Sequence, residues 1–335
     1  ENGILLKSGE ALEEANHVNM VVFDKTGTIT NGTPVVTDVV TADSTDADAL
    51  IRLAASLEVA SEHPLGEAIV AKAKEQEAAF DEVTNFEAIP GFGIKGHVGE
   101  TLVFLGNEKW MRENGLANAK MNEQANHFAE QGKTPLYIGY NDAVQGLIVV
   151  ADTVKESSAR AIQTLHEMGI QVAMMTGDHE RTAQAIAAEV GIDRVFSEVL
   201  PQDKANYVSK LQEEGYIVAM VGDGINDAPA LAQAQVGIAI GTGTDVAIES
   251  ADAVLMKSDL MDVPAMLKLS RATIRNIKEN LFWAFAYNII GIPFAMGVLH
   301  LFGGPLLNPM IAGAAMSFSS VSVVLNALRL KRWKA

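Results

Sequence analysis

Residues suited to phosphoryl chemistry follow several apolar runs of this 335-residue sequence. The run at residues 20–23 leads into the string DKTGT, which contains Asp24, Lys25 and Thr26. Three more strings follow in order: Thr176-Gly177-Asp178, PQDK ending in Lys204, and GDGIND with Asp223, Asn226 and Asp227. One carboxylate of such a set can attack phosphorus, and two others can hold Mg²⁺, which prefers oxygen ligands. Threonine hydroxyls, backbone N–H groups and the lysine ammonium group can surround the transferred group.

Each string carries little information by itself. An isolated DGxxD is more often a turn, and an isolated TGD more often begins a helix. All of them together, in this order along one chain, are specific. The interpretation as a phosphoryl-transfer site therefore depends on the series and not on any one member.

A second group of residues is suited to binding a nucleotide. His63 in SEHP can stack on an adenine ring, and the glycines of GFGIKG, which include Gly91 and Gly93, let the backbone approach a ligand closely. Glu58 and Asn107 lie on either side of these strings. The glycine pattern alone is weak because it does not join a strand to a helix as in a dinucleotide site. His63 alone is more often a residue that starts a helix.

Up to residue 270 the pattern is that of an α/β protein. Apolar runs at 20–23, 147–151, 172–176, 217–222 and 236–241 are predicted strands, and helical segments separate most of them. Such alternation predicts a parallel sheet with crossover helices, and the polar strings collect where its strands end. Residues 41–145 interrupt the series and predict an inserted domain.

The charge is distributed unevenly. The formal net charge of -17 argues against a broad nucleic-acid interface, so no nucleic-acid partner is expected. The absence of cysteine excludes thiolate metal sites and disulfides within these residues. Residues 281–302 and 305–328 contain no Asp, Glu, Lys or Arg, and each run is long enough to cross a bilayer as a helix. Basic residues flank both outer ends, which predicts that these ends lie on the cytoplasmic side. The first residue is Glu1, and we expect the chain to be a piece of a longer protein.

Polar residues within the two apolar runs are candidates for a cation path. Tyr287 and Asn288 lie in the first run, and Met316 and Ser317 in the second. Polar groups inside a membrane are costly unless they are partnered or functional, and a thioether sulfur is a soft ligand suited to Cu(I). Helix packing is the alternative role for these residues.

The strings DKTGT, TGD and GDGxND resemble those of the P-type ATPases, cation pumps that pass through a phospho-aspartate, and the resemblance covers essentially the whole chain. It implies that Asp24 is the phosphorylated residue. The other catalytic residues that it implies are Lys25, Thr26, Thr176, Gly177, Asp178, Lys204 and Asn226. The Mg²⁺ site that it implies consists of Asp24, Asp223 and Asp227.

The resemblance to the heavy-metal branch of this family implies an ATP site formed by Glu58, His63, Gly91, Gly93 and Asn107. The strings YN and MSxSS are similar to those of its copper-exporting members, which implies a path for Cu(I), or Ag(I), along Tyr287, Asn288, Met316 and Ser317. Implied partners are membrane lipid, ATP, Mg²⁺ and Cu(I) delivered by a copper chaperone.

The implied fold is α/β: a haloacid-dehalogenase-like Rossmannoid phosphorylation domain at 1–40 and 146–270, with an inserted α+β nucleotide-binding domain at 41–145. A two-helix transmembrane hairpin and tail occupy 271–335. The expected location is a bacterial plasma membrane, with cytoplasmic catalytic domains.

Two alternatives stay open. A zinc or cadmium pump of the same family is one, although such pumps usually carry an acidic residue in the second span and this sequence has none there. A haloacid-dehalogenase-type phosphatase is the other. Phosphatases of this fold usually carry a second acid two residues after the nucleophile, where this chain has Thr26.

Overall fold

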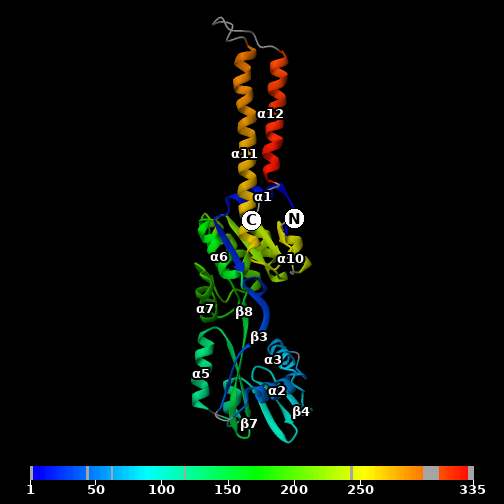
Figure 1. Cartoon of the computed structure of the whole chain (residues 1–335). Helices are drawn as coiled ribbons and strands as arrows, with labels where there is room; N and C mark the ends of the chain where they lie inside the picture. The colour runs from blue at the N-terminus through cyan, green and yellow to red at the C-terminus, as the bar shows by residue number, and fades with distance from the viewer. Residues whose placement is uncertain are drawn as a thin grey trace.

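The structure is a computed structural model that describes residues 3–42, 45–61, 63–116, 118–241, 244–296 and 309–330. It is elongated, with a seven-stranded sheet unit in the middle, a six-stranded sheet unit at one end and two long helices at the other (Figure 1).

The middle unit is built on a sheet with the strand order β1-β13-β12-β11-β2-β9-β10. Its strands are β1 (Ile4–Leu6), β2 (Met20–Asp24), β9 (Gln171–Met175), β10 (Arg194–Phe196), β11 (Val218–Gly222), β12 (Val236–Ile240) and β13 (Ala253–Leu255). Neighbouring strands are parallel except for β1, which runs antiparallel to β13. The predicted parallel α/β sheet is therefore confirmed.

Helices cover both faces of this sheet because successive strand residues point to opposite sides. On β2, Val21 and Phe23 pack on one side, and Met20 and Val22 on the other. The first face is covered by α1 (Gly9–His17), α6 (Ser158–Glu167), α7 (Glu180–Val190) and the start of α11 (Asp262–Ala295). The second is covered by α8 (Lys204–Glu213), α9 (Ala228–Gln233) and α10 (Asp245–Ser250). Short helical turns η1 (Lys25–Ile29), η2 (Pro201–Asp203) and η3 (Ile225–Asp227) lie between these elements.

The second unit has an antiparallel sheet with the order β3-β8-β7-β6-β5-β4. Its strands are β3 (Thr30–Thr41), β4 (Val83–Ile89), β5 (Gly93–Val98), β6 (Thr101–Gly106), β7 (Thr134–Tyr140) and β8 (Ala143–Val154). One face carries α2 (Ala47–Glu58) and α3 (Pro64–Glu75), and the other carries α4 (Glu108–Glu113) and α5 (Ala119–Glu130). Strands β3 and β8 form the ribbon that joins the two units (Figure 1).

The prediction that residues 147–151 form a strand of the parallel sheet is wrong. They lie in β8, antiparallel to both of its neighbours. Ile148 and Val150 pack on one face of the second sheet, and Leu147 and Val149 on the other. A strand buried on both faces is apolar throughout whichever way its neighbours run, so the pattern could not separate the two cases. The pairing of β3 with β8 extends from Thr41 back to Thr30, so it lies almost entirely outside the predicted inserted domain at 41–145.

The long helix α11 begins against the middle unit and continues beyond it, where α12 (Pro309–Leu330) lies beside it (Figure 1). The Ser270 hydroxyl donates to the Leu12 carbonyl, and the Asn276 amide donates to the Asn326 carbonyl of α12 at 2.8 Å. No helix among the residues described is both long and apolar enough to cross a membrane. Gly303 and Gly304, which separate the two apolar runs, lie outside the described residues, so the transmembrane hairpin stays a prediction.

Candidate active site

Asp24 stands at the carboxyl end of β2, next to the centre of the parallel sheet. Its neighbours β9 and β11 run in the same direction, so the loops that begin at Thr176 and Asp223 open at the same edge. This is the edge at which α/β sheets bind ligands. The sheet therefore brings together strings that are up to two hundred residues apart in the sequence.

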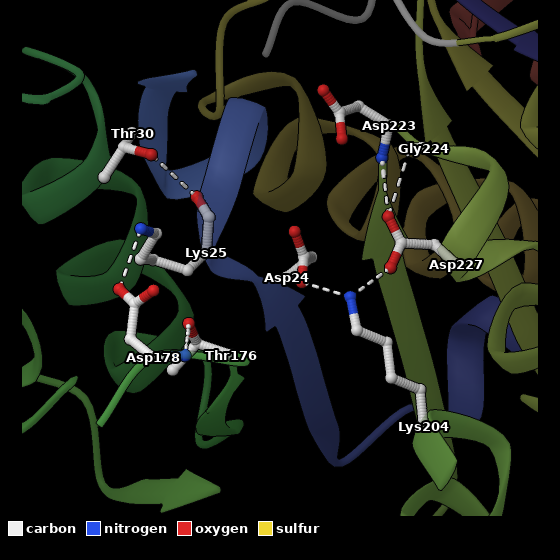
Figure 2. A network of polar contacts seen from close by, with 9 residues as sticks. All are labelled: Asp24, Lys25, Thr30, Thr176, Asp178, Lys204, Asp223, Gly224 and Asp227. Atoms are coloured by element: carbon white, nitrogen blue, oxygen red, sulfur yellow. Dashed lines mark hydrogen bonds and ion pairs between the residues drawn. The ribbon is translucent and has the colours of Figure 1, made fainter. Parts of the chain in front are cut away.

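Three carboxylates and one ammonium group meet at this edge. Asp24, Asp223 and Asp227 each offer an oxygen, and these atoms lie within 4.8 Å of one another. The Nζ atom of Lys204 lies 2.5 Å from Asp24 Oδ1 and 2.6 Å from Asp227 Oδ1 (Figure 2). Asp24 and Lys204 are each only 7% exposed, and Asp227 is 2% exposed. Such close, buried contacts hold the Asp24 carboxylate in one orientation.

The electrostatic environment follows from burial and crowding. Burial raises the pKa of Asp24 to about 6, the nearby Asp227 carboxylate adds to the rise, and Lys204 opposes it. Burial and Asp227 also raise the pKa of Asp223. Burial disfavours the charged form of Lys204, but Asp24 and Asp227 together raise the pKa of this ammonium group above its usual value. The cluster carries more negative than positive charge, so it is suited to a cation.

The donor set fits Mg²⁺. All three side chains supply carboxylate oxygens, which are the ligands that this hard cation prefers. The Asp227 carboxylate is fixed by the backbone N–H groups of Asp223, at 3.3 Å, and Gly224, at 3.1 Å. The loop after Asp24 packs against Asp223 so closely that a Cβ atom on Gly27 would lie 1.9 Å from Asp223 Oδ2. Gly27 also has a φ of 73°, so only glycine fits this turn without strain.

Other residues of the predicted site lie around this cluster without joining it. The Lys25 side chain points away from Asp24 and pairs with Asp178 at 2.8 Å (Figure 2). The hydroxyl of buried Thr176 accepts a hydrogen bond from the Asp178 backbone N–H at 3.0 Å. Thr26, Gly177 and Asn226 are exposed at the same strand ends. They are therefore free to meet a bound molecule.

A cavity of about 460 Å³ in the second unit brings together all five residues of the predicted nucleotide site. Its lining includes Glu58, His63, Gly91, Gly93 and Asn107. The Asn107 side chain donates to the Gly91 carbonyl at 2.8 Å and caps α4 by accepting from the Trp110 N–H at 2.8 Å. His63 caps α3 through an Nδ1 atom that accepts from the Leu65 N–H at 3.2 Å. These bonds hold two parts of the cavity wall in place, the Gly91 turn beside α4 and the start of α3.

One acidic group in this cavity has unused bonding capacity. Glu58 is only 7% exposed, and its Oε2 atom has no hydrogen-bond partner among the described residues. Burial raises the pKa of this carboxyl group, with Ser61 and His63 opposing the rise. A buried polar atom without a partner is costly, so Glu58 is suited to a ligand that supplies a hydrogen bond.

The candidate cation-path residues lie on the two long helices, and the side chain of Met316 lies outside the described part of the structure. Tyr287 and Asn288 lie on α11, and Met316 and Ser317 on α12. The Asn288 amide donates to the Ala284 carbonyl and the Ser317 hydroxyl to the Gly313 carbonyl, each within its own helix. In the described part of the chain, no hydrogen bond joins Tyr287 or Asn288 to Ser317.

Sequence reasoning missed two residues at the end of β8. Asp152 accepts from the Thr30 hydroxyl at 2.5 Å and from the Gly32 N–H at 2.9 Å. Lys155 donates to the Gly27 carbonyl at 2.6 Å. The signal was present, since polar residues follow the apolar run at 147–151 just as they follow the other strands. Neither residue belongs to one of the recognised strings, and their contacts depend on the pairing of β3 with β8.

Comparison with known proteins defines the class to which this fold and site belong. Residues 18–235 match the family model described as haloacid dehalogenase-like hydrolase, and the chain belongs to this family. The predicted haloacid-dehalogenase-like fold is thereby confirmed.

More particular similarities cover the whole chain. It is 52% identical over 336 residues to a copper-exporting P-type ATPase of Staphylococcus aureus strain MRSA252, and equally to that of strain USA300. The match covers 100% of this chain and 40% of the length of these relatives. The predicted resemblance to copper-transporting P-type ATPases is confirmed.

Solved structures of ATPases are also similar to this chain. The crystal structure of a zinc-transporting PIB-type ATPase in the E2.Pi state has a TM-score of 0.88 and 38% identity, over 98% of this chain and 52% of that one. The catalytic domain of the CPx-ATPase CopB-B has a TM-score of 0.60 and 28% identity, over 80% of this chain and 96% of that one.

Proposed function

We propose that this chain is part of a P-type ATPase that exports Cu(I), and also Ag(I), across a membrane by ATP hydrolysis through a phospho-aspartate at Asp24. The observation that carries the proposal is the position of Asp24, buried at a central strand end and held by Lys204 beside two further carboxylates. The chain spans 40% of the curated relatives that it matches, so pumping is proposed for the longer protein.

The chemistry follows from the positions of these groups. An Asp24 oxygen would attack the γ-phosphorus of ATP, the bond from phosphorus to the ADP oxygen would break, and ADP would leave. Lys204 would hold the nucleophile and counter negative charge on the transferred group. Asp24, Asp223 and Asp227 would hold Mg²⁺, which would neutralise charge on the phosphoryl oxygens. Thr26, Thr176 and Gly177 would contact the phosphoryl group, Asn226 would support it, and Asp178 would assist its hydrolysis.

The residue two positions after Asp24 favours a pump over a phosphatase. Thr26 has no carboxylate, so it cannot act as the general acid and base that speeds hydrolysis of the phospho-enzyme. The phospho-aspartate is therefore expected to persist long enough to be coupled to transport.

ATP is proposed to bind in the cavity of the second unit. His63 would stack on adenine, Glu58 would exchange a hydrogen bond with it, and Gly91, Gly93 and Asn107 would shape the wall. The β3–β8 ribbon joins this unit to the middle unit, so bending of the ribbon would bring the γ-phosphate to Asp24.

Gly93→Ala is expected to weaken ATP binding at least about tenfold. The new Cβ atom would lie 2.2 Å from the Leu105 carbonyl oxygen, and the φ of 154° at this position is unfavourable for alanine. Isothermal titration of the full-length protein with a non-hydrolysable ATP analogue measures the effect. Gly99→Ala is the matched control, because Gly99 also has a positive φ but open space around it. Equal affinities of the two variants would contradict the assigned cavity.

Helices α11 and α12 are proposed to continue into a membrane as a hairpin. Large apolar side chains of α11 are exposed, including Phe282 at 64% and Ile289 at 68%, and a bilayer or further helices of the longer protein would cover them. Cu(I), delivered by a copper chaperone, would pass Tyr287, Asn288, Met316 and Ser317. The catalytic units would then lie in the cytoplasm, at a bacterial plasma membrane.

Cu(I) and Ag(I) are expected to stimulate ATP hydrolysis by the full-length protein, and Met316→Leu is expected to abolish this stimulation. The change keeps size and apolarity but removes the soft sulfur ligand. Metal-dependent phosphate release measures it, with Met310→Leu in the same helix as the control. ATP binding should be unchanged in both variants.

Zinc is the second candidate cargo, because the similar solved pump is described as zinc-transporting. A divalent ion in this path would lack a compensating carboxylate, since residues 305–328 contain none. Stronger stimulation by Zn(II) than by Cu(I), or normal copper stimulation of Met316→Leu, would refute the copper assignment and leave the P-type mechanism standing.

A further inference from the structure

Lys155 connects three segments beside the candidate active site. It directly follows β8, and its Nζ atom donates to the Gly27 carbonyl at 2.6 Å and to the Ser258 hydroxyl at 2.8 Å. Its backbone N–H donates to the Ile29 carbonyl at 3.0 Å. The residue is 9% exposed. One side chain thus joins the end of the ribbon, the loop after Asp24 and the segment that leads into α11.

Lys155 is linked through Gly27 to Asp223, one of the proposed Mg²⁺ ligands. Gly27 packs directly against the Asp223 carboxylate, because a Cβ atom added to Gly27 would lie only 1.9 Å from Asp223 Oδ2. The ammonium group holds the carbonyl of this same residue. Lys155 therefore sets how closely the loop approaches Asp223, and Asp152 fixes the start of β3 through Thr30 and Gly32.

The charge of Lys155 is as important as its hydrogen bonds. Burial lowers the pKa of this ammonium group, while Asp223, Asp152 and Asp259 oppose the change. In return, Lys155 opposes the raised pKa of Asp223. A neutral donor could hold the Gly27 carbonyl without the cost of burying a charge. The presence of a buried cation next to a carboxylate cluster points to charge balance as a second role.

We propose that Lys155 is a positioning residue for phosphoryl transfer, which holds the Gly27 peptide against Asp223 and balances the charge of the carboxylate cluster when no Mg²⁺ is bound. This inference rests on the proposed function. It predicts opposite effects on the phosphorylation rate and on the affinity for Mg²⁺. Loss of Lys155 should slow phosphorylation because the loop is released, yet it should strengthen Mg²⁺ binding because a competing positive charge is gone.

The test compares Lys155→Met with Lys155→Arg in the full-length protein. At saturating Mg²⁺ and ATP, Lys155→Met is expected to phosphorylate at least about tenfold more slowly, the effect of losing a charge-assisted hydrogen bond. Its half-saturating Mg²⁺ concentration should fall severalfold. Lys155→Arg should keep the Mg²⁺ dependence of the parent protein and recover part of the rate.

Lys7→Met is the matched control, because the Lys7 ammonium group also donates to backbone carbonyls, those of Ile248 and Glu249 at 2.7 Å. It should change neither quantity. The same Mg²⁺ series is repeated without ATP, with the thermal unfolding midpoint as readout, and Lys155→Met should respond at lower Mg²⁺ concentrations than the parent protein.

Three results would overturn the proposal. The first is a normal phosphorylation rate in Lys155→Met, and the second is a slow rate with an unchanged or raised half-saturating Mg²⁺ concentration. The third is an unfolding midpoint of Lys155→Met that does not respond to Mg²⁺ at lower concentrations than that of the parent protein. A parent protein that is not phosphorylated at all would instead refute the proposed function, and the ATP-free series would still decide the role of Lys155.

Discussion

The Asp24→Asn variant of the full-length protein is expected to incorporate no phosphate from ATP, with a loss of at least about 10³-fold in acid-stable, hydroxylamine-sensitive label. Asparagine keeps the size and most hydrogen bonds of aspartate, but its amide is not a nucleophile. Incubation with γ-labelled ATP followed by acid precipitation measures the loss.

Thermal stability separates the chemistry of Asp24 from its role in folding. Asp24 is buried among like charges from Asp223 and Asp227, so its replacement by a neutral residue removes repulsion as well as the ion pair with Lys204. We therefore expect no loss of thermal stability in Asp24→Asn. Label of normal intensity on this variant would assign the phosphorylated residue to another position.

Lys204→Met is expected to have two large effects at neutral pH: a destabilisation of roughly 3 kcal/mol and a loss of at least about 10²-fold in the phosphorylation rate. The ammonium group lies within 2.6 Å of two buried carboxylates, and its removal leaves both without their cation. Urea unfolding gives the stability, and a single-turnover phosphorylation assay gives the rate.

A double-variant comparison tests the cause of that destabilisation. If unpaired carboxylates are responsible, Asp24→Asn combined with Lys204→Met should be more stable than Lys204→Met alone, because one of the two stranded charges is gone. Lys204→Arg, which keeps the charge, should lose less stability than Lys204→Met. Additive effects of the Asp24 and Lys204 changes would show that the two side chains do not interact as the distances indicate.

The second unit shows how much of a binding site can be predicted from local sequence patterns. The glycines near Gly93, the capping residue His63 and Asn107 were recognisable from the sequence, and the structure gathers them around one cavity. The lack of a hydrogen-bond partner for Glu58 Oε2 among the described residues was not predictable, because it depends on which backbone groups α2 and α3 place around it. The role of Lys155 was not predictable either, because its bond to the Gly27 carbonyl depends on where β8 ends beside the loop after Asp24.

The sequence alone was enough to predict the class of fold, which the family match confirms, and to propose the residues of the reaction. Strings such as DKTGT and GDGIND are local, and their residue types limit the chemistry, while alternating strands and helices predict a parallel sheet whose strand ends share one edge. Only the tertiary structure decided the pairings: that Lys204 bridges Asp24 and Asp227, that Lys25 turns to Asp178, and that Lys155 holds Gly27. Each of these bonds joins residues from different loops. Their geometry depends on the packing of whole helices against the sheet, which no spacing along the chain encodes.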